Sequence, residues 1–325
     1  MSTKDRYKLD KKWVQKIKAA GKRIGFHLVR VTSADPARDA SFYRDWIARG
    51  YHGEMAYLER HVEKKMDPKK ILTSSRSIIC CALSYRTAAA HPITAKEGHG
   101  LISNYAWGDD YHKIMDKKLK TLSREMKEWI PNLETRQYCD TGPILERGLA
   151  ARAGVGWIGK NTCLIHPTYG SYLFLGEILA NIEFDLDTPG LDHCGSCTRC
   201  LDACPTDALI APYRMDASRC IAYLTIEKRG DFTESQKKMV GDHIFGCDIC
   251  QQVCPWNNQA VTPDLADFRP REGHHHPPLE AMASLSQSEF EEKFSRSPIK
   301  RAKLEGLKRN AAAILLALDP ERPLE

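Results

Sequence analysis

The sequence predicts an α+β or α/β domain over residues 1–188, then a cysteine-rich domain and a short helical segment. Short apolar stretches that suit buried strands alternate with amphipathic stretches in the first 188 residues. Eight of the 12 cysteines lie between Cys194 and Cys254, which sets residues 189–258 apart as a second domain. A connector rich in proline and histidine leads into basic helices, and together they form residues 259–325.

The first predicted elements alternate helices with strands. Residues 8–24 favour a helix, and residues 26–32 favour a strand. A helical stretch around 39–60 and a loop containing Pro68 follow. Residues 77–85, SIICCALSY, predict a buried strand, because the run is short, apolar and rich in residues that suit a sheet.

A long amphipathic helix follows a loop and a further strand. The loop covers residues 87–100, and residues 102–108, ISNYAWG, favour the strand. Apolar residues then recur at helical spacing from Tyr111 to Ile130, which predicts a helix with one apolar face. Pro131 ends this helix, because proline cannot continue it.

The last part of the first domain returns to strands. Residues 136–140, RQYCD, favour a strand, and Pro143 opens a predicted helix that runs to about Ala153. Residues 162–184 favour strands joined by a turn.

The composition indicates a cytoplasmic protein without a membrane span. The first residues, MSTKDRYKLDKKW, are charged, and no apolar segment follows them as it does in a secretory signal. The sequence has no apolar run of about 18 residues, the length that a membrane helix needs. Cytosolic thiols stay reduced, so the clustered cysteines are predicted to be metal ligands and not disulfides.

The clustered cysteines are spaced as ligands of two iron–sulfur clusters. The run 194-CGSCTRCLDACP-205 has the bacterial ferredoxin spacing, and 247-CDICQQVCP-255 repeats it without the leading cysteine. In that pattern the fourth cysteine of each run ligates the other cluster. Cluster A therefore takes Cys194, Cys197, Cys200 and Cys254. Cluster B takes Cys204, Cys247 and Cys250, and we assign Cys220, the one cysteine left in this domain, as its fourth ligand.

A zinc site is the alternative for these cysteines. Zinc usually takes two C-x2-C pairs and does not need the longer run that ends in proline, so the spacing favours two [4Fe–4S] clusters. Two clusters in one small domain would relay single electrons. The other cysteines lie in apolar, strand-like runs and are predicted to be buried thiols without a chemical role: Cys80, Cys81, Cys139 and Cys163.

Two features of the first domain have both a structural and a functional interpretation. The run 154-GVGWIG-159 matches a dinucleotide-binding pattern, but a predicted helix precedes it and a strand follows, which is the reverse of that motif. It is either a turn that lets the backbone approach another group closely or a helix end. Asp140, between a strand and a helix, is either a turn or N-cap residue or a general acid at a pocket.

Charge and histidine are concentrated near the C-terminus. The net charge is only +6, but residues 296–309 hold six Lys or Arg against one Glu. Such a run is either a solvated helix face or a surface for a phosphate backbone. His274, His275 and His276 lie in a proline-rich connector and are predicted to be in a solvated loop.

Three segments together resemble one family. They are 140-DTGPILERGLAARAGVGWIGKNTCLI-165, 194-CGSCTRCLDACPTDALI-210 and 246-GCDICQQVCPWN-257. They are similar to the epoxyqueuosine reductases, cobalamin-dependent iron–sulfur enzymes that complete the synthesis of queuosine in tRNA. The similarity extends from about residue 10 to residue 315, and the combination of the three segments is specific.

The resemblance implies a fold and a reaction. Residues 1–188 would form a cobalamin-binding catalytic domain with a nitroreductase-like or reductive-dehalogenase-like sheet. Residues 189–258 would form the two-cluster ferredoxin-like domain, and residues 259–325 a connector and a truncated stub of HEAT-like helices. The substrate would be epoxyqueuosine at the wobble position of a tRNA, reduced to the alkene. That reaction needs two electrons and a proton for the leaving oxygen, which Asp140 would donate.

The resemblance also implies contacts with the cofactor and the RNA. Cobalamin would be bound base-off without a histidine ligand, in keeping with the absence of a D-x-H-x-x-G run. By positional match, the corrin contacts would be Lys65, Ser103, Asp140, Asn161, Leu164, Ile221, Asp248 and Ile249. The basic C-terminal segment and the second domain offer six candidate tRNA contacts: Tyr223, Lys228, Lys300, Arg301, Lys308 and Arg309. We expect a monomer and an external electron donor such as a flavodoxin or ferredoxin.

Two other functions are compatible with parts of the pattern. A reductive dehalogenase shares a corrin domain and paired clusters, but such enzymes usually carry a twin-arginine signal, which this N-terminus lacks. A ferredoxin-type electron carrier would need the clusters but no cobalamin. Binding of cobalamin separates the carrier from the two enzymes, and the substrate separates the enzymes from each other.

Overall fold

The computed structural model describes residues 8–319, which form two compact units. The first unit comprises the chain up to Arg49 with Leu58–Ser84 and Tyr111–Cys197. The second comprises Gly50–Tyr57, Tyr85–Asp110 and the chain from Thr198 onward. The change of unit after Cys197 lies close to the predicted boundary at residue 188, and the second unit includes two segments from the predicted first domain. No helix among the described residues is both long and apolar enough to cross a membrane.

A four-stranded sheet forms the centre of the first unit. Its order is β2 (Leu28–Ser33), β3 (Ser77–Ser84), β8 (Leu173–Ala180) and β5 (Thr135–Tyr138), and every neighbouring pair is antiparallel. All eight residues of β3 are buried, as its apolar run predicts for a central strand. An antiparallel sheet with helices packed on it is an α+β fold, so the α/β alternative is wrong for this unit.

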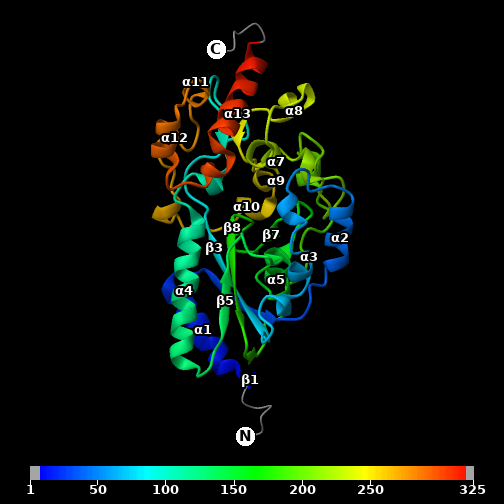
Figure 1. Cartoon of the computed structure of the whole chain (residues 1–325), viewed down its shortest axis with the longest axis vertical. Helices are drawn as coiled ribbons and strands as arrows, with labels where there is room; N and C mark the ends of the chain where they lie inside the picture. The colour runs from blue at the N-terminus through cyan, green and yellow to red at the C-terminus, as the bar shows by residue number, and fades with distance from the viewer. Residues whose placement is uncertain (1–7, 320–325) are drawn as a thin grey trace. The chain divides into compact units, whose positions relative to one another are not determined.

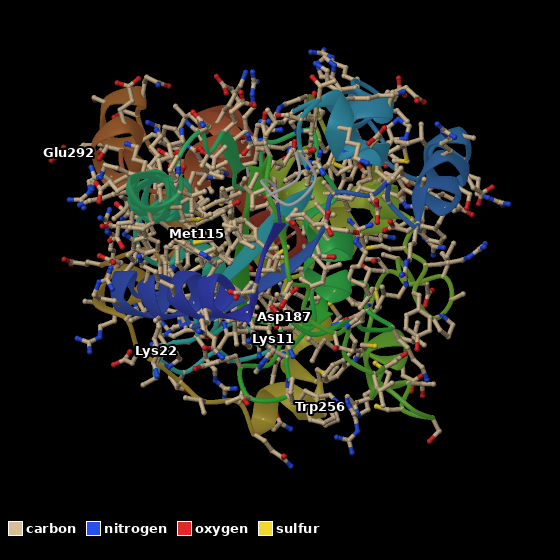
Figure 2. The ribbon with its side chains drawn as sticks, turned by 90° about the horizontal axis from the view of Figure 1, so that it is seen from below. Lys11, Lys22, Met115, Asp187, Trp256 and Glu292 are labelled. Carbon is tan, nitrogen blue, oxygen red and sulfur yellow. The ribbon has the colours of Figure 1, made fainter. Side chains whose placement is uncertain are left out.

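Helices cover the sheet of the first unit. Helices α1 (Lys11–Ile24) and α4 (Tyr111–Trp129) pack against each other and on β2 and β8 (Figure 1). Gly176 of β8 lies against Met115 of α4, and a side chain at this glycine would collide with the helix. Figure 2 shows Met115 in the interior and Lys22 of α1 at the surface. Side chains alternate along a strand, so the neighbour of Gly176 in β8 faces away from α4.

Short elements complete the first unit. Helix α5 (Glu146–Arg152) packs against β2, β3 and β8, together with the buried side chains of Cys80 and Leu179. The remaining elements are α2 (Ala40–Ala48), α3 (Val62–Met66), a 3₁₀ turn at Pro68–Lys70, the parallel pair β1 (Lys8–Leu9) and β9 (Glu183–Phe184), and the antiparallel pair β6 (Trp157–Ile158) and β7 (Leu164–Ile165).

The second unit is mainly helical. A strand pair joins β4 (Leu101–Ile102) to β10 (His243–Phe245), and α13 (Lys303–Leu318) packs on β10. Trp107, Phe245 and Phe294 are among the largest buried side chains of its core. Its other helices are α6 (Arg199–Asp202), α7 (Ile221–Ile226), α8 (Glu234–Met239), α9 (Ile249–Gln252), α10 (Pro255–Asn258), α11 (Leu279–Ala283) and α12 (Gln287–Phe294).

Three local predictions are wrong. The predicted strand 102–108 ends at Ile102, because a 3₁₀ turn follows in which the Asn104 N–H donates to the Asp248 carboxylate. The helix predicted from Pro143 begins only at Glu146, whose side chain bonds to the preceding turn. His274 is not solvated: its ring is 2% exposed, packs against Phe294 and contacts the Lys293 carbonyl.

Candidate active site and cluster-binding region

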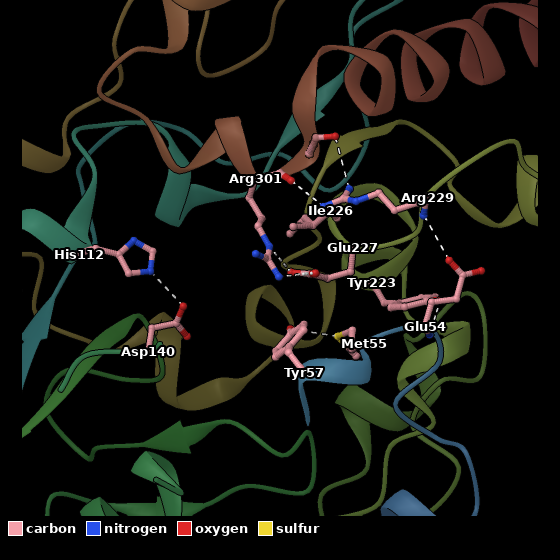
Figure 3. Close-up of polar contacts among 11 residues, drawn as sticks. Glu54, Met55, Tyr57, His112, Asp140, Tyr223, Ile226, Glu227, Arg229 and Arg301 are labelled. Carbon is pink, nitrogen blue, oxygen red and sulfur yellow. Dashed lines mark hydrogen bonds and ion pairs between the residues drawn. The ribbon is translucent and has the colours of Figure 1, made fainter. Parts of the chain in front are cut away.

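Asp140 lies in a turn directly after β5. Its backbone has a φ of 60°, in the left-handed region, which aspartate tolerates better than most residues. Its side chain is 57% exposed and contacts His112 of α4, with 3.0 Å between the Asp140 carboxylate and Nε2 (Figure 3). The Asp140 N–H donates to Glu146 Oε1 at 2.6 Å. An exposed carboxyl held in place by two neighbours can exchange a proton with a bound molecule.

A half-buried carboxyl group, Glu146, and a fully buried one, Glu177, lie behind this turn. Burial and the neighbouring Asp140 charge raise the pKa of Glu146 to about 7. Glu177 of β8 is fully buried, and burial and the adjacent Glu146 raise its pKa well above the usual range. In the register of the sheet, Glu177 is opposite Tyr138 on one side and Cys80 on the other.

The glycine run after α5 serves both as a helix end and as a point of close approach. Gly154 has a φ of 80°, and a side chain there would collide with the Thr188 carbonyl. A side chain at Gly156 would collide with the Ile165 carbonyl. A helix precedes the run and strand β6 follows, so the order is the reverse of a dinucleotide-binding motif.

Apart from the exposed Asp140, the corrin candidates of the first unit are buried. Lys65 is 8% exposed, and its Nζ donates to the Leu58 carbonyl at 2.8 Å; burial lowers its pKa. Asn161 and Leu164 are 3% and 4% exposed, and Asn161 Oδ1 accepts from the Cys163 N–H. Asn161 and Leu164 lie between the glycine run and the cysteine motif in sequence. The role of all these residues as corrin contacts stays a prediction.

Lys160 holds the loop at the start of the first cysteine motif through two hydrogen bonds. Its Nζ donates to the Gly195 carbonyl at 2.6 Å and to the Cys197 carbonyl at 3.0 Å. The two carbonyls flank the predicted ligands Cys194 and Cys197, so one ammonium group fixes the loop that carries them. A positive charge here would also stabilise a reduced cluster, because reduction adds negative charge.

The cysteines assigned to cluster B all lie in the second unit. Burial raises the pKa of Cys247, and Cys220, Asp248 and Cys204 are close enough to raise it further. The short helices α6 and α9, which carry Cys200 and Cys250, pack against each other. The proximity of Cys204, Cys220 and Cys247 fits the proposed ligand set, including Cys220, which lies outside both motifs.

Within residues 8–319, no three His, Cys, Asp or Glu side chains converge as they would around a single metal ion. A four-iron cluster differs from such a site, because each of its irons takes one thiolate.

Asp248 is the centre of a buried polar network in the second unit. Its carboxylate accepts from Ser103 Oγ at 2.6 Å and from the Asn104 N–H at 2.7 Å, and lies 2.8 Å from His91 Nε2. Burial alone would raise the pKa of Asp248, but these neighbours lower it below its usual value. The four corrin candidates of this unit, Ser103, Ile221, Asp248 and Ile249, are all at most 9% exposed.

The candidate RNA contacts differ in how far their side chains are already engaged. Arg309 donates to the carbonyls of Leu224, Lys228 and Gly230, and its burial lowers its pKa to about 10. Arg301 forms two hydrogen bonds with the Glu227 carboxylate (Figure 3).

The other four RNA candidates range from buried to exposed. Tyr223 is 6% exposed, with its hydroxyl bonded to the Glu54 N–H. Lys228 pairs with Glu54 at 2.8 Å. Lys300 is exposed and Lys308 is half-buried. Contact of all six candidates with RNA stays a prediction.

Two family models match separate parts of the chain. One, described as "Epoxyqueuosine reductase QueG, DUF1730", matches residues 65–141. The other, described as "4Fe-4S double cluster binding domain", matches residues 193–257 and so favours iron–sulfur clusters over zinc. An epoxyqueuosine reductase from Synechocystis sp. is 44% identical over 90% of this chain and 100% of its own length. The chain belongs to the epoxyqueuosine reductase family.

Solved epoxyqueuosine reductases have the same fold. One structure, with an epoxyqueuosine-modified tRNA-Tyr stem loop, has a TM-score of 0.85 and 32% identity, and covers 94% of this chain and 81% of its own. A structure from Bacillus subtilis, with its catalytic aspartate loop swung out of the active site, has the same TM-score, 33% identity and the same coverage. As an epoxyqueuosine reductase family member, the chain is an oxidoreductase that carries 4Fe–4S clusters.

Four residues with clear geometric roles are absent from the sequence predictions. His112 and Glu146 hold Asp140, Lys160 holds the cysteine loop, and Glu177 contacts Glu146. Only Glu177 has a signal in the sequence, since it is the one charged residue in the apolar run LFLGEILA. The other three depend on contacts that no local pattern specifies.

Proposed function

We propose that this protein reduces the epoxide of epoxyqueuosine to the alkene of queuosine at the wobble position of a tRNA. The observation that carries the proposal is the family membership over nine-tenths of the chain, together with an exposed, braced carboxyl at Asp140. The reaction consumes two electrons and two protons and releases water. Cobalamin, bound base-off without a histidine ligand, would supply the reducing cobalt centre, and two [4Fe–4S] clusters would deliver electrons one at a time.

The chain's own residues would provide the ligands and the proton. Cys194, Cys197, Cys200 and Cys254 would hold cluster A, and Cys204, Cys220, Cys247 and Cys250 would hold cluster B. Asp140 would donate a proton to the leaving oxygen, with His112 and Glu146 keeping its carboxyl in place. In the Bacillus subtilis relative the catalytic aspartate lies on a loop that can swing out, which fits the exposed turn that carries Asp140 here.

The proposal extends to partners and location. A cytoplasmic monomer would receive electrons from a flavodoxin or ferredoxin and would bind tRNA through its basic C-terminal segment. The domain division at residues 188 and 258, and the HEAT-like character of the last helix, belong to the proposal as well. No observation on the described residues favours the reductive dehalogenase or the electron carrier.

Turnover of modified tRNA tests the proposal directly. The protein is purified without oxygen, analysed for iron and cobalt, and incubated with cobalamin, a chemical reductant and epoxyqueuosine-containing tRNA. Mass spectrometry of the nucleosides should show conversion to queuosine. A protein with both clusters and bound cobalamin that leaves the tRNA unchanged would overturn the proposal, and dechlorination in a parallel organohalide assay would support the dehalogenase.

A further inference from the structure

The side chains of Glu146 and Glu177 meet behind the Asp140 turn. Glu177 lies in the middle of β8 and is 0% exposed. It belongs to the face of the sheet that packs on α5, because the adjacent Gly176 faces α4. Glu146 stands in the first turn of α5. The strand and the helix therefore bring two carboxyl groups together beside the apolar side chains of Leu149 and Leu179.

This pair requires a proton. Neither oxygen of Glu177 receives a hydrogen bond from an N–H or hydroxyl group in the described part of the chain, and the group it contacts is the Glu146 carboxyl. Two carboxyl groups can form a hydrogen bond only when one of them is protonated, and two adjacent carboxylates in an apolar site repel strongly. The pKa values of both groups are raised, which is consistent with a shared proton.

Glu146 also holds the Asp140 backbone. Its Oε1 accepts the Asp140 N–H at 2.6 Å, a distance typical of a strong hydrogen bond to a carboxylate. Asp140 has a φ of 60°, a conformation that an L-residue adopts only at a cost in free energy. A hydrogen bond from a rigid helix onto this N–H offsets that cost and selects one orientation of the turn.

We propose that Glu146, by sharing one proton with Glu177, is a positioning residue that latches the Asp140 loop in its acid-presenting conformation. The role of Asp140 as an acid rests on the proposed function, but the hydrogen bond by which Glu146 holds the Asp140 loop does not. The proton stays with the buried pair, which leaves Glu146 an oxygen to accept the Asp140 N–H. Loss of that proton puts two negative charges side by side and pushes the Glu146 side chain away from Glu177.

The latch should weaken as the pH rises. Both pKa values are raised on folding. The hydrogen bond between the two carboxyl groups raises the pKa of Glu177 and lowers that of Glu146, so the shared proton lies on Glu177 and is lost only above the Glu146 pKa of about 7. The protonated pair therefore stabilises the folded state below the unfolded glutamate pKa of about 4.3, and this contribution is lost as the pH rises through about 7 and beyond. The other ionisable groups around the pair are Arg147 and Asp140 beside Glu146, the Cys80 and Cys81 thiols beside Glu177, and His112 on Asp140.

Hydrogen exchange at the Asp140 amide measures the latch without cobalamin or tRNA. The full chain is compared with Glu146→Gln, Glu177→Gln and the control Glu128→Gln, an exposed glutamate of α4. Glu146→Gln should exchange about tenfold faster, because a neutral acceptor binds the N–H more weakly than a charged one. Glu177→Gln should keep the protection and lose its pH dependence, since the amide donates to Glu146 at every pH.

Turnover of the same variants gives a second measurement. Glu146→Gln should lower kcat and leave KM for tRNA unchanged. The Asp140 carboxyl would be held less firmly, which slows proton transfer but leaves tRNA binding as it is. Exchange in Glu146→Gln equal to that of Glu128→Gln overturns the latch. Loss of protection in Glu177→Gln overturns the shared proton. A wild-type protein that protects the Asp140 amide but does not convert epoxyqueuosine overturns the proposed function and leaves the latch standing.

Discussion

Asp140 of the first unit and Asp248 of the second show how one residue type serves two purposes. Both lie near a histidine, His112 at 3.0 Å and His91 at 2.8 Å. The Asp140 side chain is 57% exposed, whereas the Asp248 side chain is 2% exposed and accepts from Ser103 and Asn104 as well. Several donors around a buried carboxylate keep it ionised, so Asp248 cannot act as an acid near neutral pH.

The difference teaches that the surroundings of an aspartate, and not its histidine partner, decide its use. Asp248 ties the 3₁₀ turn at Asn104–Ala106 to the cysteine loop that begins at Cys247. Asp140 is largely exposed to solvent, and His112 is bonded to its carboxylate. Asp248 is suited to hold structure together, and Asp140 is suited to transfer a proton.

The largest effect is expected at Asp140. Asp140→Asn should lower the turnover of epoxyqueuosine by about 10²–10⁴-fold, the usual contribution of a general acid. Iron content, cobalamin binding and thermal stability should stay at wild-type values, because the side chain is exposed. Full turnover in this variant would show that Asp140 is not the proton donor. Loss of folding would show that Asp140, like Asp248, holds the structure together.

Asp248 should behave in the opposite way. Asp248→Ala leaves the buried partners His91, Ser103 and Asn104 without their acceptor and should lower the free energy of unfolding by about 3 kcal/mol. Chemical denaturation measures this, with the exposed Asp267→Ala as a control. The pKa of Asp248 is lowered on folding, so its contribution is present above the unfolded pKa of about 3.9 and is lost as the pH falls below it.

Cys220 tests whether the region around Asp248 encloses a metal centre. Cys220→Ser should remove cluster B and leave the four sulfurs of cluster A, so the iron content should fall from about eight to about four per chain. Iron analysis and the spectrum of the reduced protein measure this change. Cys163→Ser, outside the cysteine-rich segment, is the control and should keep all of the iron. Full iron content in Cys220→Ser would assign the ligand elsewhere.

The smallest effect is expected on the basic helix α13. Lys308→Ala should weaken tRNA binding modestly and reduce the slope of log affinity against log salt by about 1. Arg309→Ala should mainly lower thermal stability, because its guanidinium bonds to the Lys228 and Gly230 carbonyls. Equal effects of the two variants on the salt slope would show that Arg309 also contacts the phosphates.

The sequence predicts secondary-structure elements well where the signal is local. The apolar spacing from Tyr111 predicts α4, which spans Tyr111–Trp129, and the apolar run at residues 77–85 predicts β3. Seven of the eight cysteine assignments come from spacing and Cys220 from elimination, and all eight stay predictions. The strand predicted at 102–108 fails because Asn104 bonds to Asp248, a residue 144 positions away. A distant partner overrides local preference, and no local pattern encodes it.

The same limit applies to the candidate site. Asp140 is found from its place between a strand and a helix, and its proposed role comes from the family resemblance. His112 is 28 positions from Asp140, and Glu177 meets Glu146 only because β8 pairs with β5 and packs on α5. The sequence and the family resemblance therefore give a candidate acid but not the groups that hold it.

Cys80 and Cys81 in β3 are completely buried, so they serve as internal controls in a chemical-labelling experiment. Burial raises the pKa of both thiols well above the usual range, so neither forms the thiolate that alkylating reagents attack. In the proposed assignment, iron would protect the eight cysteines of the cluster-binding segment until it is removed. Brief alkylation followed by peptide mapping would therefore show, cysteine by cysteine, which cluster is lost first when the protein meets air.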